Sequence, residues 1–133
     1  MNVWFAPPGR QKSLLLADLM ACVTSGQPWL RSDVRGALPL FETSQMPGLW
    51  IDLDNGGALT DERFEAVGRA YSLPKTTPLW YISMPTPWPN LSREGGEEII
   101  DYYVKDTGAT FIVIDNLRAI SSDIDCLLYT SPS

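Results

Sequence analysis

Lys12 and Ser13 close a segment, Ala6 to Ser13, whose residue types and spacing suit the binding of a phosphate group. The segment reads APPGRQKS, and the phosphate-binding pattern is G-x-x-x-x-G-K-[ST], in which the lysine reaches the phosphates and the hydroxyl binds Mg²⁺. Ala6 and Gln11 stand where the pattern has glycines. Because the lysine and the hydroxyl are kept, the segment is a candidate variant of a phosphate-binding loop.

Two later segments end in carboxylates that could serve such a site. Leu49 to Asp54 reads LWIDLD, and its two aspartates, Asp52 and Asp54, lie two residues apart and so on one face of a strand. The run FIVID ends at Asp115 about a hundred residues after the loop, as in the second motif of nucleotide sites, where an Asp holds Mg²⁺ directly or through water. An ordinary turn-capping Asp is the alternative interpretation of Asp115, and the loop before it favours the nucleotide site.

Apolar runs typical of strands alternate along the chain with helical patterns. We predict strands at 2–6, 49–54, 79–83 and 110–115, and helices at 11–25, from Thr60 onward and at 97–105. Thr60 is the expected N-cap of the second helix, and the first helix is apolar on nearly all sides, which predicts that it is buried. The alternation indicates an α/β protein with a parallel sheet and helices on both faces. In such sheets the ligand lies at the carboxyl ends of the strands.

The composition is that of one soluble globular domain, with 133 residues, 44% hydrophobic content and a net charge of -6. This charge gives no basic footprint for nucleic acid. The absence of histidine excludes the Ser-His-Asp and Cys-His nucleophile systems and the commonest zinc sites. No apolar run is long enough to span a bilayer and no signal peptide is present, so we expect a cytoplasmic protein without membrane contact.

Trp88 lies in the proline-rich loop MPTPWPNLS and allows two interpretations. A loop tryptophan more often forms a lid over the local core than a platform on which a base stacks. The sequence alone leaves both open.

Taken together, these motifs resemble the RecA-like P-loop ATPases, and especially the branch of plasmid RepA-like and DnaB-like replicative helicases. The resemblance covers about residues 3–122 and rests on APPGRQKSLLLADLMACVTSGQPWL, LWIDLDNG and FIVIDNLRAISS. It implies an incomplete RecA-like P-loop fold that binds and hydrolyses ATP with Mg²⁺. It also implies a hexameric homo-oligomer, and DNA contacts through loops that follow the end of this chain.

The resemblance assigns roles by position. Lys12 matches the lysine on the β- and γ-phosphates, and Ser13 and Asp115 match the two Mg²⁺ ligands. Asp54 aligns with a glutamate that activates the attacking water, with Asp52 as the fallback because Asp is one methylene shorter than Glu. Arg118 either senses the nucleotide state or is a surface arginine. The residues that would bind the nucleotide are Pro8, Gly9, Arg10, Gln11, Lys12 and Ser13.

Gln11 is the main departure from the family pattern, because a non-glycine residue at positive φ costs on the order of 1 kcal/mol. Three functions therefore stay open. The first is a RecA-like motor ATPase in DNA replication, which the motifs favour. The second is a nucleotide-binding regulatory module without turnover, and the third is a P-loop kinase of a small molecule.

The last eight residues, Cys126 to Ser133, read CLLYTSPS and follow Asp125 without periodicity or turn signals. They match, residue for residue, the translation of the transposase mosaic-end adapter of sequencing libraries. We therefore interpret 126–133 as an adapter-derived tail and 1–125 as the N-terminal part of a truncated RecA-like domain. On this interpretation a strand is missing between the two motif-bearing strands, so the fragment alone is expected to be poorly stable and inactive.

Overall fold

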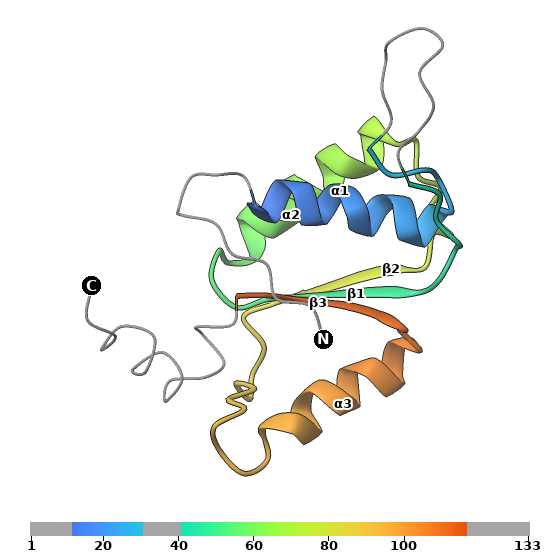
Figure 1. Ribbon diagram of the computed structural model, residues 1–133. Helices are drawn as coiled ribbons and strands as arrows, with labels where there is room; N and C mark the ends of the chain where they lie inside the picture. The colour runs from blue at the N-terminus through green and yellow to red at the C-terminus, as the bar shows by residue number, and fades with distance from the viewer. Residues whose placement is uncertain (1–11, 31–40, 117–133) are drawn as a thin grey trace, which may run out of the picture.

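The computed structural model describes residues 12–30 and 41–116 of the chain, and helices and strands alternate through that part. Figure 1 shows their arrangement. The helices are α1 (Lys12–Ser25), α2 (Gly57–Ala70) and α3 (Gly96–Thr107), and the strands are β1 (Gly48–Asp52), β2 (Leu79–Ser83) and β3 (Phe111–Asp115). Each element predicted within the described residues is therefore confirmed in type. The strand predicted at 2–6 and the tail at 126–133 lie outside them.

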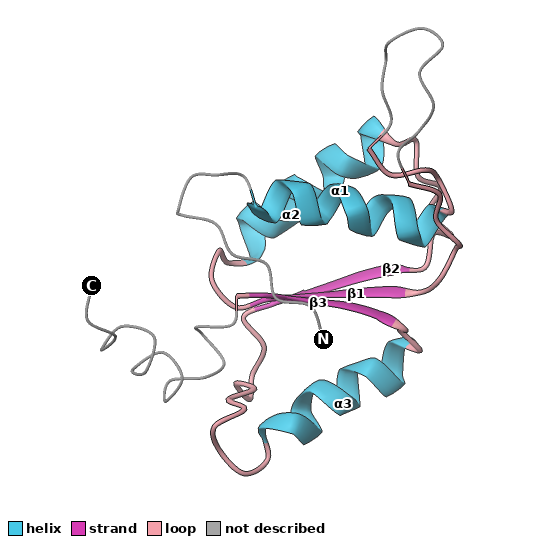
Figure 2. Cartoon of the chain, in the orientation of Figure 1, coloured by secondary structure: helices cyan, strands magenta, loops and turns pink. Residues whose placement is uncertain are grey.

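The strands form a parallel sheet of order β2-β1-β3. The chain moves outward from β1 to β2 through α2 and then returns across β1 to β3 through α3. Crossovers that run in opposite directions with one hand place their helices on opposite faces. Accordingly, α1 and α2 cover one face and α3 covers the other (Figure 2). The predicted α/β class is confirmed, and the arrangement is consistent with part of a RecA-like fold.

The core has one layer on each face of the central strand β1, which is buried along its whole length. On the α1 and α2 face, Trp50 packs with Met20 and Phe64, and on the α3 face Leu49 and Ile51 pack with residues of α3. A strand buried on both faces explains why LWID reads as a continuous rather than an alternating apolar run.

Gly48 allows α1 to approach β1 closely. A Cβ atom at this position would lie 2.4 Å from the sulfur of Met20 and 2.7 Å from Cγ2 of Thr24. Both partners are fully buried, so neither has free space to move into. The glycine therefore fixes the height of α1 above the sheet.

Helix α1 is buried only in part. Its C-terminal half, from Met20 to Thr24, is buried, whereas Leu14 and Leu15 are 49% and 41% exposed. The prediction of a helix buried on all sides holds for the half that lies on the sheet, because no described element covers the first turn on its outer side. Among the described helices, including this apolar one, none combines the length and hydropathy needed to cross a membrane.

Helix α2 begins earlier than predicted. Its N-cap is Gly56, at φ 84°, and Thr60 lies inside the first turn, where its hydroxyl makes no cap. Instead, the Thr60 hydroxyl donates a hydrogen bond to the carboxylate of Asp52 at 2.8 Å. The prediction of Thr60 as N-cap is wrong, because a buried carboxylate competes for the hydroxyl.

Candidate functional site

Ser13 and Asp115 are joined by a hydrogen bond although 102 residues separate them. The Ser13 hydroxyl donates to Oδ2 of Asp115 at 2.7 Å, from the first turn of α1 to the last residue of β3. Asp115 is 4% exposed. Lys12 is the first residue of α1, so its side chain starts at the positive end of the helix dipole, where anions are favoured. Three predicted site residues therefore lie at the carboxyl edge of the sheet.

Asp52 lies at the same edge, in register with Ser83 on one side and Asp115 on the other. Its carboxylate is fully buried, and hydrogen bonds reach both of its oxygens. Oδ1 accepts from the backbone N–H groups of Asp54 and Asn55, at 3.1 and 2.9 Å, and from the Asn55 side chain at 3.4 Å. Oδ2 accepts from the hydroxyls of Ser83 and Thr60, at 2.6 and 2.8 Å.

These contacts keep Asp52 ionised. Burial raises the pKa of its carboxyl, but the hydrogen bonds from Ser83, Asn55, Asp54 and Thr60 outweigh burial and hold that pKa below its usual value. Because both oxygens are occupied and shielded from solvent, Asp52 is not placed to activate a water molecule. It orders the turn after β1 instead, and the fallback role considered for it from the sequence has no support in this geometry.

Asp54 differs from Asp52 in exposure and in partners. Its side chain is exposed, and its Oδ2 accepts a hydrogen bond from Nδ2 of Asn116 at 3.3 Å. The preceding residue is hydrogen bonded to the end of β3, since the N–H of Leu53 donates to the carbonyl of Asp115 at 2.8 Å. Asp54 is thus close to the end of β3 and open to solvent, as a carboxylate that contacts water must be.

Sequence reasoning missed three of these residues. Ser83 ends a predicted strand, and its register with Asp52 could have been found only after the order of the strands was known. Thr60 was assigned to a cap, and Asn116 was given no role although it lies in the segment FIVIDNLRAISS. Several predicted residues lie outside the described part of the chain, namely Pro8, Gly9, Arg10, Gln11 and Arg118.

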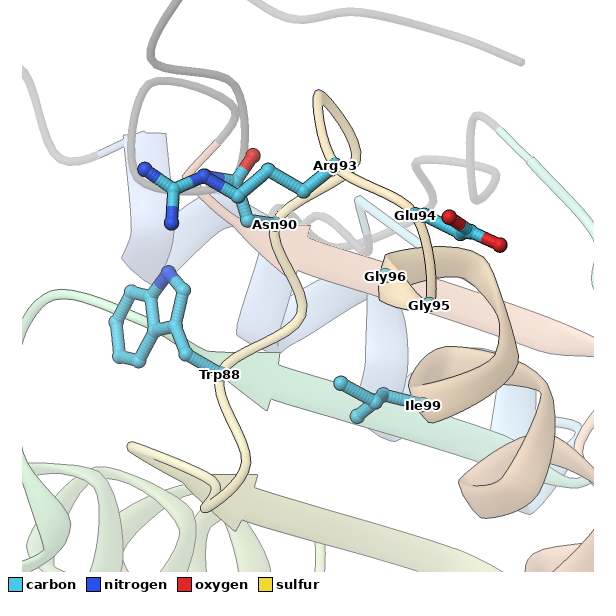
Figure 3. A pocket seen from close by; sticks show the side chains of 7 residues that line it. All are labelled: Trp88, Asn90, Arg93, Glu94, Gly95, Gly96 and Ile99. Carbon is cyan, nitrogen blue, oxygen red and sulfur yellow. The ribbon is translucent and has the colours of Figure 1, made fainter.

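A separate pocket lies in the loop between β2 and α3. The pocket has a volume of about 260 Å³, and Trp88 and Ile99 form its apolar walls (Figure 3). The other lining residues are Asn90, Arg93, Glu94, Gly95 and Gly96. Trp88 is 37% exposed, whereas its neighbour Pro89 is fully buried. Pro89 therefore anchors the loop to the core, and Trp88 forms a pocket wall. Much of the polar capacity here is used within the loop, since the Asn90 side chain accepts from the N–H of Ser92 at 2.9 Å.

The fold and the site define a class of protein. A lysine and a serine open a helix at the carboxyl edge of a parallel sheet, and the serine contacts an aspartate that ends a buried strand. This is the arrangement of an α/β nucleotide-binding protein of the P-loop type.

The particular family follows from comparison with known proteins. A family model described as an AAA domain matches residues 1–125, so the chain belongs to this family of nucleotide-binding, ATPase-type domains. No curated protein and no solved structure gives a significant match.

Proposed function

We propose that this chain is the ATP-binding and ATP-hydrolysing part of a RecA-like motor that acts in DNA replication. The observation that carries the proposal is the Ser13–Asp115 hydrogen bond. It joins the end of the candidate phosphate loop to the second carboxylate motif, as a shared nucleotide and metal site requires.

The donor set fits Mg²⁺. This ion prefers oxygen ligands and is commonly held by one or two protein groups plus phosphates, and Ser13 and Asp115 supply a hydroxyl and a carboxylate side by side. When bound with ATP, Mg²⁺ neutralises charge on the β- and γ-phosphates. In the proposed site Ser13 and Asp115 would hold the ion, and the first backbone N–H groups of α1 would donate to the phosphates.

Lys12 and Asp54 divide the remaining roles. Lys12 places its ammonium group on the β- and γ-phosphates at the positive end of α1. Asp54 orients the attacking water, for which its carboxylate is suited because it is exposed and lies beside the end of β3. Phosphoryl transfer depends mainly on positioning and charge, so a chain without histidine can carry it out.

Further parts of the proposal rest on the family resemblance. We propose that the intact protein is a hexamer and that it contacts DNA through loops downstream of this chain. The net charge of -6 agrees with DNA contacts made elsewhere.

Lys12→Ala and Asp54→Ala in the intact protein test the proposal, with ATP binding and hydrolysis measured with and without single-stranded DNA. We expect Lys12→Ala to abolish hydrolysis and Asp54→Ala to reduce it strongly while binding is kept. Lys75→Ala is the matched control, because Lys75 is exposed and precedes β2 at the opposite edge of the sheet.

The shortness of Asp54 favours a second candidate, a nucleotide-binding module without turnover. Tight ATP binding with no hydrolysis, in the presence of DNA, would establish that function instead. Hydrolysis that persists in Asp54→Ala would reassign the water-orienting role.

A further inference from the structure

Asn116 directly follows the candidate Mg²⁺ ligand Asp115, and its side chain contacts the other candidate carboxylate. Its Nδ2 donates to Oδ2 of Asp54 at 3.3 Å, across 62 residues of sequence. We propose that Asn116 is a positioning residue, which holds the Asp54 carboxylate in the orientation needed to act on water. The inference rests on the proposed function, since it gives Asp54 its orientation.

Three hydrogen bonds hold Asp54 and the residue before it in place. Its backbone N–H donates to the buried carboxylate of Asp52 at 3.1 Å. The N–H of the preceding residue, Leu53, donates to the Asp115 carbonyl at 2.8 Å, and the Asn116 amide holds the side chain. The first two hydrogen bonds fix only the backbone. An exposed side chain on a fixed backbone still rotates about χ1 and χ2, so the contact with Asn116 selects among its rotamers.

The chemistry of the contact suits this role. An amide N–H that donates to a carboxylate binds one oxygen and leaves the second oxygen able to accept a hydrogen bond from water. The short aspartate needs such help more than a glutamate does, because misplacement of a reacting group by about 1 Å costs about a hundredfold in rate. Asn116 also shares a backbone with Asp115, so the orientation of Asp54 is set relative to the metal ligand.

Asn116→Asp and Asn116→Ala separate positioning from structure. The aspartate variant keeps the size of the side chain but replaces the amide donor with a second carboxylate. We expect both variants to lower kcat by about tenfold and to change KM for ATP by less than about twofold. The reason is that the lost hydrogen bond to the Asp54 carboxylate affects the attack by water and not the binding of ATP. Asn116→Gln keeps the donor and should recover part of the loss.

Thr76→Asp is the matched control for the added charge. Thr76 is exposed in the turn before β2, at the amino edge of the sheet, so its charge lies far from the site. We expect its kcat to stay at the wild-type value. An equal loss in this control would mean that net charge, not position, explains the result for Asn116→Asp.

A double-mutant cycle decides whether Asn116 acts through Asp54. In the Asp54→Ala background, Asn116→Ala should change kcat by less than about twofold, since its target is gone. An unchanged tenfold loss there, or a wild-type kcat in the single Asn116→Ala variant, overturns the inference. If Asp54→Ala alone leaves kcat unchanged, both this inference and the role of Asp54 in the proposed function are wrong.

One readout is independent of turnover. The side-chain amide signals of Asn116, assigned in an ¹⁵N–¹H spectrum from their loss in Asn116→Ala, should shift in Asp54→Ala and not in Thr76→Asp. Should the intact protein bind ATP without hydrolysing it, the proposed function fails while this spectrum still tests the contact. Unshifted signals in Asp54→Ala overturn the inference in every case.

Discussion

The carboxyl edge of the sheet has two parts that are held together in different ways. At the inner edge, which we define as the ends of β1, β2 and β3 with the start of α1, side chains 102, 62 and 31 residues apart are hydrogen bonded. In the outer loop, which we define as residues 85–95 after β2, the backbone hydrogen bonds described link near neighbours, such as the N–H of Arg93 and the carbonyl of Asn90. Long-range contacts form only when the whole fold forms, so the inner edge couples site geometry to folding.

Asp52→Ala should break the inner edge and have the largest effect. It removes the acceptor of five buried or half-buried donors, so we expect the free energy of unfolding of the intact protein to fall by about 3–5 kcal/mol. Urea denaturation measures this loss. Glu62→Ala, at an exposed position of α2, is the control and should change it by less than about 0.5 kcal/mol. Equal stabilities for the two variants would show that the hydrogen bonds of Asp52 do not hold the inner edge together.

Asp115→Asn should separate the regions by activity. The amide keeps the size of the side chain but loses the charge that would hold Mg²⁺ in the proposed function, so we expect hydrolysis to fall about a hundredfold and the Mg²⁺ requirement to rise. Glu94→Gln is the same change in the outer loop and should leave hydrolysis within about twofold. ATPase rates over a Mg²⁺ titration compare the two. Similar losses in both variants would show that the outer loop also belongs to the site.

The sequence predicted the order and type of these elements well, because each strand is a dense apolar run and each helix has a recognisable pattern, although the start of α2 was misplaced. The strand predicted at 79–83, for example, coincides with β2 to the residue, and the strand predicted at 110–115 differs from β3 only by one residue at its start. Lys12, Ser13 and Asp115 could be proposed as site residues because a known motif fixes their order along the chain. The approach of Ser13 to Asp115 agrees with that motif.

What sequence could not supply is the competition among polar groups at the edge. Thr60 has the residue type of a cap, yet a buried carboxylate takes its hydroxyl, and Asp52 and Asp54 look equivalent until burial separates them. Asn116 enters the site only through the order β2-β1-β3, which brings the ends of β1 and β3 together. Such relations depend on strand order, and strand order is a property of the whole chain.

Acid should lower the free energy of unfolding as the Asp52 carboxylate becomes protonated. Burial raises the pKa of this carboxyl, but its hydrogen bonds lower it more, so it lies below the usual 3.8 in the folded protein. A depressed pKa stabilises the fold fully above the unfolded value, and this contribution is lost as pH falls through the folded value. Urea unfolding between about pH 6 and about pH 3 should therefore show a loss of stability that Asp52→Asn, which cannot titrate, lacks. Parallel curves for the two proteins would mean that other carboxyls set the acid limit.

Trp88→Ala should have the smallest effect on the reaction. The side chain is 37% exposed, and the loop is anchored by buried Pro89, so we expect a stability loss of about 1 kcal/mol and hydrolysis within about twofold of wild type. Trp88→Phe keeps an aromatic wall and separates loss of packing from loss of the indole. A tenfold or greater fall in hydrolysis for Trp88→Ala, with stability kept, would place the pocket in the reaction. The inner edge and the outer loop would then be two parts of one site, because a region held mainly by local hydrogen bonds would also contribute to the reaction.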